Sequence, residues 1–472
     1  MQFVASSGRF WLPGHPHRVV HGDLAFDDDG IRLRLADPLR APAEIAPGCV
    51  GGSPQVATES VVYGRFHDGT EVTLLNASGY SMPVEQMQET WSASFALTGG
   101  LIAADHFSQV MVELDYLMPW ARPPGIVDPR PPATTFTIDP RRAVLGEASL
   151  PDGRTVRMIT GVDGRADEAS VRFDQWCAFE IEGQPASLIE ILNEWVRPLQ
   201  DLLVVCLGRP VRLKTILLRP TDQDPGLSLL GVSFNAVQPP AGQPPSAAQL
   251  ESYAAPTLLT HTRSPVPFAD LMRQWFSLCA RLPAPITLLC GPYYAPFIYS
   301  QHRYASTFQS AEALAHALSD GRREKTPSEH RQRVDAVTAA LEKAQLDPDT
   351  VRWATSIVRG RNDKPLRTLM EDLIASTGDM GTRLLTALPD LPTLAAAVRT
   401  SVSHPATTGP GILERHWIGE ALIWVIRAHL LAQTGLNIND LSASVTAKPA
   451  FQQILQELAA LAAPPGGQPT DS

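Results

Sequence analysis

The segment VRTSVSHP holds two residues, Arg399 and His404, whose chemistry fits phosphate transfer. An arginine can bind phosphate oxygens and stabilise the negative charge that develops on them. A histidine titrates near neutral pH, so it can take a proton from a ribose 2′-hydroxyl and return one to a leaving 5′-oxygen. This pair of residue types therefore indicates RNA cleavage without a metal ion.

The spacing of the pair is not distinctive by itself, but its predicted position is. Two other Arg–His pairs have similar spacings, about as many as the composition alone would produce, and both lie in predicted loops or at a helix start. They are Arg9/His15 and Arg323/His330. Arg399 and His404 instead close a helix predicted over residues 392–403. Five residues turn a helix by about 140°, so both side chains can reach one groove.

The sequence contains no established cofactor or metal motif. It lacks a phosphate-binding loop, a dinucleotide fingerprint, HExxH, GxSxG and CxxC. His15, His17 and His21 have no matching ligand spacing, so we interpret them as loop residues. The five cysteines are odd in number and widely spaced, which favours free thiols in a reducing compartment. We therefore expect neither a cofactor nor a bound metal.

Two kinds of periodicity divide the chain. Residues 31–35 alternate apolar and basic side chains, the pattern of a half-buried strand, and similar segments recur up to residue 234. Further strands are predicted at 61–63, 72–75, 110–114, 135–138, 156–159, 171–181, 213–218 and 229–234. Ser187 and Glu190 form a capping-box pattern before the one clear helix of this part. The first half is thus expected to be β-rich and sandwich-like, with a few helices.

From about residue 265 the chain reads as helical. The clearest helix start is Thr326 with Pro327 and Glu329, which supply a cap, an N1 proline and a reciprocal carboxylate. Other helices are predicted at 268–279, 308–318, 348–360, 366–374, 392–403, 413–434 and 451–458. The longest, 413–434, is expected to stop at Gly435.

The proline-rich stretch at 119–132 predicts a boundary or a long crossing loop, and the one at 239–245 predicts a linker or an exposed loop. We expect a β-rich subdomain over 1–125, a mixed α/β subdomain over 133–290, an all-helical domain over 296–462 and a disordered tail over 463–472. The net charge is −10, of which −9 falls in residues 1–295, so any RNA contact should come from a local patch in the C-terminal part. No signal peptide and no apolar run long enough to span a membrane are found, so we expect a cytoplasmic protein without membrane contact.

These features together resemble a known family. An Arg-x4-His pair that closes one helix and precedes a long amphipathic helix resembles the HEPN domain. The wider chain resembles the ApeA-like proteins of bacterial phage defence, in which a β-rich region precedes a C-terminal HEPN domain. The segments that carry this likeness are FWLP at 10–13, Gly22 to Leu24, residues 31–35, LMPW at 117–120, LMRQWF at 271–276, Phe308 and Glu312.

The resemblance implies an abortive-infection effector, a toxin that cleaves RNA through attack of the 2′-hydroxyl, with tRNA among the candidate substrates. It further implies a homodimer through the HEPN domain, an N-terminal region that senses or restrains, and a phage-encoded trigger protein. Arg399 would hold the scissile phosphate and His404 would transfer protons. The residue after the arginine is usually asparagine or another strongly polar group in the family, whereas Thr400 stands here as a possible accessory residue.

Three other interpretations stay open. The first is a catalytically silent HEPN scaffold that only binds RNA or a protein partner, which the acidic N-terminal half and Thr400 favour. The second takes His404 as an ordinary helix-end histidine and Arg399 as a surface ion-pair partner. The third is a carbohydrate-active β-sandwich enzyme, for which the sequence offers no pair of carboxylates.

Overall fold

The computed structural model describes most of the chain as two compact units, each with its own core. The described residues are 6–27, 30–40, 55–81, 89–102, 106–123, 142–166, 171–221, 229–234, 246–252, 254–295, 298–319, 324–403 and 410–462. The first unit comprises Met1–Ser252, Leu259–Ser277 and Tyr293–Pro296, and the second comprises Tyr253–Leu258, Leu278–Pro292 and Phe297–Ser472.

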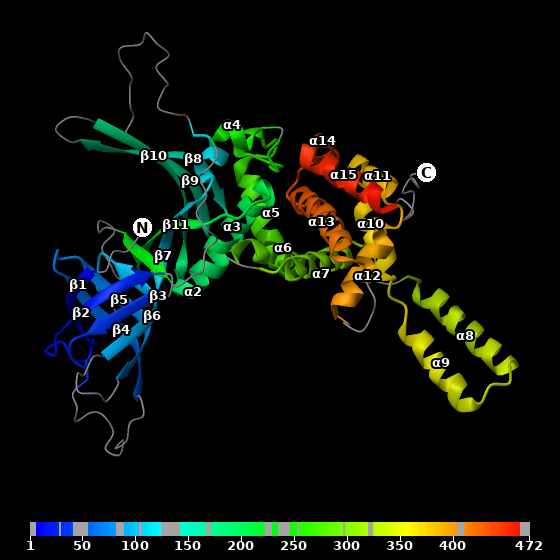
Figure 1. Cartoon of the computed structure of the whole chain (residues 1–472), viewed down its shortest axis with the longest axis horizontal. Coiled ribbons are helices and arrows are strands. Elements are labelled where there is room, and N and C mark those ends of the chain that lie inside the picture. The colour runs from blue at the N-terminus through cyan, green and yellow to red at the C-terminus, as the bar shows by residue number, and fades with distance from the viewer. Residues whose placement is uncertain are drawn as a thin grey trace, which may run out of the picture. The chain divides into compact units, whose positions relative to one another are not determined.

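The first unit begins with a closed barrel of six antiparallel strands (Figure 1). They are β1 (Ser6–Trp11), β2 (Val20–Asp27), β3 (Gly30–Leu35), β4 (Gln55–Phe66), β5 (Glu71–Ser81) and β6 (Glu89–Thr98). The pairing of β3 with β6 closes it, with Leu33 opposite Trp91. Trp91 is fully buried, and a Cβ at Gly79 would lie 2.4 Å from its ring, so β5 needs glycine there.

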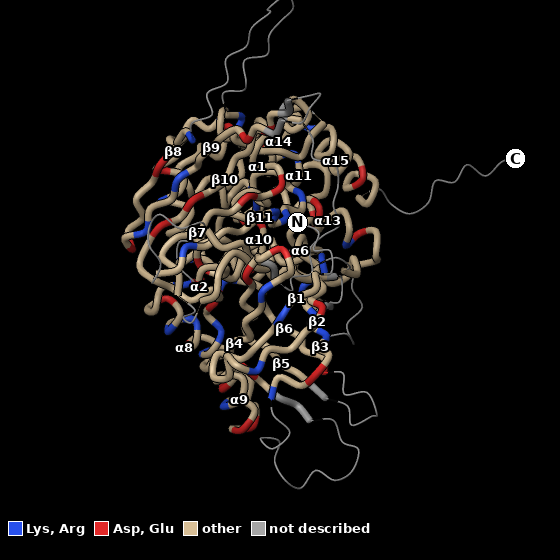
Figure 2. Tube along the Cα trace, turned by 90° about the vertical axis from the view of Figure 1, so that its left-hand side faces the viewer, with Lys and Arg blue, Asp and Glu red and all other residues tan. Residues whose placement is uncertain are grey.

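The sheet continues beyond the barrel through strands that flank the predicted proline-rich break. The order onward from β6 is β12 (Leu230–Phe234), β11 (Leu213–Pro220), β7 (Phe107–Leu114), β10 (Val171–Ala186), β9 (Thr155–Ala166) and β8 (Ala143–Ser149). Figure 2 shows basic and acidic positions interleaved along β8, β9 and β10. Among them, the buried Glu180 accepts hydrogen bonds from Arg157 and Gln109.

Short helices accompany this sheet. They are α1 (Leu117–Ala121), α2 (Leu188–Glu190), the π-helix η2 (Ile191–Val196), α3 (Arg197–Leu207), α4 (Ala247–Leu250), the 3-10 helix η3 (His261–Arg263) and α5 (Phe268–Arg281). The capping box of Ser187 and Glu190 is confirmed. The loop predicted from Pro119 is wrong at its start, because Pro119 lies within α1. The predicted strand at 135–138 and the proline-rich segment at 239–245 lie outside the described residues.

Helix α3 is buried along almost its whole length because it is covered within the first unit. The indole Nε1 of Trp275 on α5 donates a hydrogen bond to the Pro198 carbonyl oxygen at 2.6 Å, and the Trp275 ring is fully buried. Arg197 lies over the ring of Tyr294 at 3.8 Å from the centroid. These contacts hold α3 against Trp275 and Tyr294, which belong to the same unit.

The second unit is all-helical, which together with the β-rich first unit confirms the predicted fold class. Its helices are α6 (Pro283–Tyr294), α7 (Ser300–Leu318), α8 (Pro327–Lys343), α9 (Pro348–Gly360), α10 (Leu366–Ala375), α11 (Asp379–Ala387), α12 (Leu391–Ser403), α13 (Ile412–Ala432), α14 (Ile438–Thr446) and α15 (Pro449–Ala462). Helices α6, α11 and α14 were not predicted, and α7 begins eight residues before its predicted start. The predicted tail, 463–472, lies outside the described residues.

Helix α13 forms the centre of this unit. Its residues from Ile418 to Leu431 are almost all buried, including Arg427 and His429. The guanidinium of Arg427 donates to the Pro256 carbonyl oxygen at 2.8 Å and lies over the Trp424 ring. His429 Nε2 donates to the Leu373 carbonyl oxygen on α10 at 2.8 Å. Both of these buried polar side chains of α13 thus have hydrogen-bond partners, as burial requires.

Helices α8 and α9 form a hairpin that packs mainly against itself. Its start is the predicted one, since the Thr326 hydroxyl accepts from the Glu329 amide and the Glu329 carboxylate accepts from the Thr326 amide. Trp353 on α9 is 66% exposed. Among the helices that the structure describes, none has the length and apolar character needed to cross a membrane.

Candidate functional site

Arg399 lies in the last turns of α12 and is held by a carboxylate from α7. Its Nε donates to Oε2 of Glu312 at 2.5 Å. The side chains are 32% and 21% exposed, so this ion pair contributes no more than about 1 kcal/mol to stability. Its main effect is geometric, since Glu312 fixes the direction of the guanidinium. Arg399 is therefore an ion-pair partner, as one interpretation of the sequence expected.

Of the other two residues of the predicted site, the structure describes Thr400 but not His404. The Thr400 hydroxyl donates to the Ala396 carbonyl oxygen of its own helix at 2.9 Å, and the residue is exposed. A hydroxyl bonded in this way is engaged by the helix backbone. Helix α12 ends at Ser403, as the sequence predicts, and His404 follows directly but lies outside the described residues. The structure thus places Arg399 and Thr400 at the end of α12.

A small cavity opens between α7, α12 and α13, near the end of α12 that carries Arg399. Its volume is about 200 Å³. It is lined by Ser300, Gln301, His302, Tyr304, Ala305, Val398, Ile412 and Arg415. Val398 directly precedes Arg399 on α12, so the cavity and the predicted arginine share one end of that helix. Arg415 Nε donates to the Pro410 carbonyl oxygen at 2.7 Å, which anchors the guanidinium at the start of α13.

A polar network that the sequence analysis missed forms one wall of this cavity. The Tyr304 hydroxyl lies 2.5 Å from Nδ1 of His416 and 3.3 Å from Oε1 of Glu420. Glu420 also accepts from Arg303 at 3.0 Å. Tyr304 is 6% exposed, and it approaches α13 closely because Gly419 carries no side chain. The available signal was the His416–Glu420 spacing, which puts both residues on one helix face.

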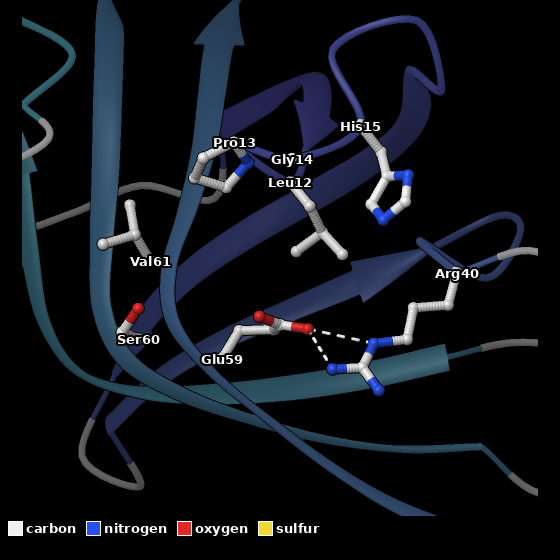
Figure 3. Close-up of a pocket in the computed structure, with 8 residues that line it drawn as sticks. All are labelled: Leu12, Pro13, Gly14, His15, Arg40, Glu59, Ser60 and Val61. Carbon is white, nitrogen blue, oxygen red and sulfur yellow. Dashed lines mark hydrogen bonds and ion pairs between the residues drawn. The ribbon is translucent and has the colours of Figure 1, made fainter. Parts of the chain in front are cut away.

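The barrel holds a larger cavity of about 460 Å³ near its β1–β2 loop (Figure 3). Its lining residues are Leu12, Pro13, Gly14, His15, Arg40, Glu59, Ser60 and Val61. Arg40 Nε donates to the Glu59 carboxylate at 2.9 Å, so the two charges offset each other. His15 and His17 lie in the loop, as expected, whereas His21 lies in β2 and corrects that expectation.

Neither metal ligands nor disulfides stand out in the part of the chain that the structure describes. It contains no group of three or more His, Cys, Asp or Glu side chains arranged to hold a metal ion. Cys177, Cys206, Cys279 and Cys290 are free thiols, and Cys49 lies outside the described residues. Burial raises the pKa of Cys177 to about 12, which makes this thiol unreactive at neutral pH.

Comparison with protein families identifies two consecutive regions. The model of ApeA N-terminal domain 1 matches residues 6–275, more than half of the chain. The model of the Apea-like HEPN domain matches residues 306–440, which run from α7 into α14 and include Arg399 and His404. Comparisons with curated proteins and with solved structures find no significant match.

Proposed function

The chain belongs to the family of ApeA-like anti-phage defence proteins with a C-terminal HEPN domain, and we propose that this domain is a metal-independent endoribonuclease. The observation that carries the proposal is the position of Arg399. It lies within the HEPN match, at the end of α12 that borders a cavity, with His404 as the first residue after the helix. Cleavage of host RNA, such as tRNA, would halt growth of an infected cell.

The proposed reaction is an internal transesterification. His404 takes the proton of the ribose 2′-hydroxyl, and O2′ forms a bond to phosphorus as the P–O5′ bond breaks. A proton passes to the departing O5′, so the products carry a 2′,3′-cyclic phosphate and a 5′-hydroxyl. Arg399 neutralises the charge on the phosphorane oxygens. Thr400 is an accessory residue whose hydroxyl is already bonded within its helix.

We propose that two chains combine their sites. HEPN domains commonly dimerise and bind RNA, and one histidine cannot both accept and donate a proton in the same instant. Two imidazoles facing each other across a twofold axis would repel as cations, which favours one neutral base beside one protonated acid. The N-terminal region, the match to ApeA N-terminal domain 1, would sense a phage-encoded trigger protein or restrain the nuclease, and the protein would act in the cytoplasm.

The experiment that tests this function measures RNA cleavage by the purified full chain in excess EDTA. We expect cleavage to continue, to leave a 2′,3′-cyclic phosphate and to stop when the cut site carries a 2′-O-methyl group. His404→Ala should abolish cleavage and should relieve growth inhibition on overexpression. Loss of cleavage in EDTA, equal cutting of DNA, or equal toxicity of the wild-type protein and His404→Ala would refute the proposal.

A second experiment tests the composite site. Arg399→Ala and His404→Ala chains, each inactive alone, should regain some cleavage when mixed, because a heterodimer rebuilds one mixed site. Confirmed heterodimers without activity would refute the shared site. A chain that sediments as a monomer at micromolar concentration and still cleaves RNA would do the same.

One alternative function is favoured by a specific contact. Glu312 occupies the Nε edge of Arg399 and places a negative charge where a phosphate would approach, which suits a silent HEPN scaffold. Such a scaffold would bind RNA or a protein partner without cleaving it. The EDTA experiment separates the two functions, because a scaffold yields no product under any metal condition.

A further inference from the structure

The cavity between α7, α12 and α13 is small enough to select a single ring system. Its volume of about 200 Å³ lies below the roughly 300–1,000 Å³ of pockets that enclose drug-sized ligands. Val398 on its wall directly precedes Arg399, so the cavity lies at the same end of α12 as the arginine that we propose binds phosphate. We infer that this cavity binds one nucleobase of a single-stranded RNA next to the scissile phosphate, an inference that rests on the proposed ribonuclease function.

The charge at the cavity suits a polyanion. Arg415 forms its hydrogen bond to a backbone carbonyl, and none of the carboxylates that the structure describes lies within 4 Å of its guanidinium. Its positive charge is thus not offset locally, in contrast to Arg303, which pairs with Glu420. Residues 296–472 have a net charge of only −1, so this part of the chain repels a polyanion less than residues 1–295 do. Arg415 would contact the phosphate that follows the bound base.

Exposed flat and apolar side chains surround the same opening. Tyr299, which precedes α7, is 80% exposed and packs edge-on against His302 with ring centroids 6.0 Å apart. Ile412 on the cavity wall is 67% exposed. Proteins recognise unpaired RNA by stacking its bases on such side chains and by hydrogen bonds to the base edges. Ser300 and Gln301 supply donors and acceptors for those edges.

The part of the wall formed by Tyr304 is held firmly in place. Tyr304 is buried, and its hydroxyl is tied to His416 and Glu420 on α13. The ring packs directly on Gly419, where an added Cβ would lie 2.2 Å from its Cδ1, and this close contact restricts its movement. A wall fixed before binding lowers the ordering cost that a ligand must meet. We call this cavity the slot. The network positions the wall of the slot and is not a catalytic group.

A second copy of the chain is the rival occupant of this surface. Leu413, at the start of α13, is 71% exposed, and together with Ile412 it could pack in a dimer. The small volume and the uncompensated charge of Arg415 favour RNA, since an apolar dimer contact would bury that charge at a cost. Dimerisation through Ile412 and Leu413 in place of RNA binding would overturn the inference.

The test uses the full chain with His404→Ala and a fluorescein-labelled 12-nucleotide single-stranded RNA, with affinity measured by anisotropy. One abasic position is moved along the RNA. We expect a single position at which loss of the base weakens binding by about tenfold. Ile412→Trp, which fills the opening, should weaken the intact RNA by a similar factor and make the abasic scan flat.

Charge variants supply the second readout. Arg415→Ala should weaken binding several-fold and lower the salt slope by about 0.7, the value for one phosphate on a single strand, while Arg415→Lys should keep most of that slope. Arg331→Ala on α8 is the matched control, an exposed arginine whose loss should leave the abasic profile unchanged. Circular dichroism confirms that each surface variant folds.

The outcomes separate the two proposals. The inference is overturned by a flat abasic scan in the chain that keeps Ile412. It is also overturned if Ile412→Trp lowers the sedimentation coefficient and leaves the RNA affinity unchanged. A wild-type chain that shows the position-specific abasic loss but never cleaves RNA supports the slot and refutes the ribonuclease. A chain that cleaves RNA with a flat abasic scan does the reverse.

Discussion

Gly419→Ala tests how closely the Tyr304 ring of α7 packs against Gly419 of α13. Gly419 lies on α13 directly under the ring of Tyr304. A Cβ at this position would lie 2.2 Å from Cδ1 and 2.9 Å from Cε1 of that ring. Carbon atoms pack best at about 3.5–4.0 Å, so the ring would have to retreat by more than about 1 Å. The change adds one methyl group and tests the whole network behind it.

The expected cost follows from three terms. Forcing an extra methyl into a packed contact costs about 1–3 kcal/mol. Alanine is a better helix former than glycine by about 1 kcal/mol, which offsets part of that cost. Moving the ring also weakens the hydrogen bonds from Tyr304 to His416 and Glu420, which costs about another 1 kcal/mol. We expect Gly419→Ala to lower the local free energy of unfolding by about 1–3 kcal/mol.

Hydrogen exchange of the full chain, read by mass spectrometry, measures this loss where it occurs. Peptides from α7 and α13 should exchange about 5 to 140 times faster in Gly419→Ala. The matched control is Gly291→Ala on α6, where an added Cβ meets no atom within 4 Å. That variant should be neutral or stabilised by up to about 1 kcal/mol.

Two results would refute this reasoning. The first is a Gly419→Ala chain whose exchange matches that of Gly291→Ala. The second comes from a double-mutant cycle, because Tyr304→Ala removes the clashing ring. If Gly419→Ala is as costly in the Tyr304→Ala background as in the wild type, the contact with Tyr304 is not its cause.

Three further predictions concern titration, capping and thiol reactivity. Burial lowers the pKa of His429 below its ordinary value of 6.5, so the unfolded chain binds a proton there at a higher pH than the folded chain does. The free energy of unfolding should therefore fall as the pH is lowered from about 7 to 5. His429→Gln should make this dependence on pH less steep when it is measured in urea titrations. Thr326→Ala removes the hydroxyl that accepts from the Glu329 amide, and should cost about 1 kcal/mol, seen as faster exchange in the first turn of α8. Burial raises the pKa of Cys177 to about 12, so this thiol should resist iodoacetamide in the native protein at pH 8. The partly exposed Cys279 should be labelled before Cys177 is. Equal labelling of the two thiols in peptide mass spectra would contradict the burial of Cys177.

Features set by local sequence were predictable. The capping boxes at Ser187 and Thr326 depend on residues three positions apart, and both form as predicted. The end of α12 at Ser403 follows from Pro405, which disfavours helical geometry in the residue before it. The family was identified for the same reason, since its markers are short segments such as the one that holds Arg399.

Features set by distant pairing were not. Closure of the barrel depends on β3 meeting β6, with Ile31 opposite Ala93, and period-2 alternation says nothing about which strands pair. Helix α7 begins at Ser300, and its buried residues include Tyr304 and Ser310. Its first turns are rich in polar residues, so they show no apolar periodicity from which the helix could be predicted. The contact between Tyr304 and His416 joins residues 112 positions apart. No local pattern reports such a contact.

The pairing of Arg399 with Glu312 connects the two proposals. A phosphate that approaches Arg399 must share the guanidinium with a carboxylate already at 2.5 Å, so Arg399 alone offers a weak binding site. The pair is partly exposed and worth no more than about 1 kcal/mol, so a phosphate delivered by other contacts can compete with Glu312. A base held in the neighbouring slot and a second phosphate on Arg415 would supply those contacts. If the domain is the ribonuclease that we propose, the Glu312 carboxylate would make cleavage depend on correct seating of the RNA, and a bare phosphate ion would not displace it.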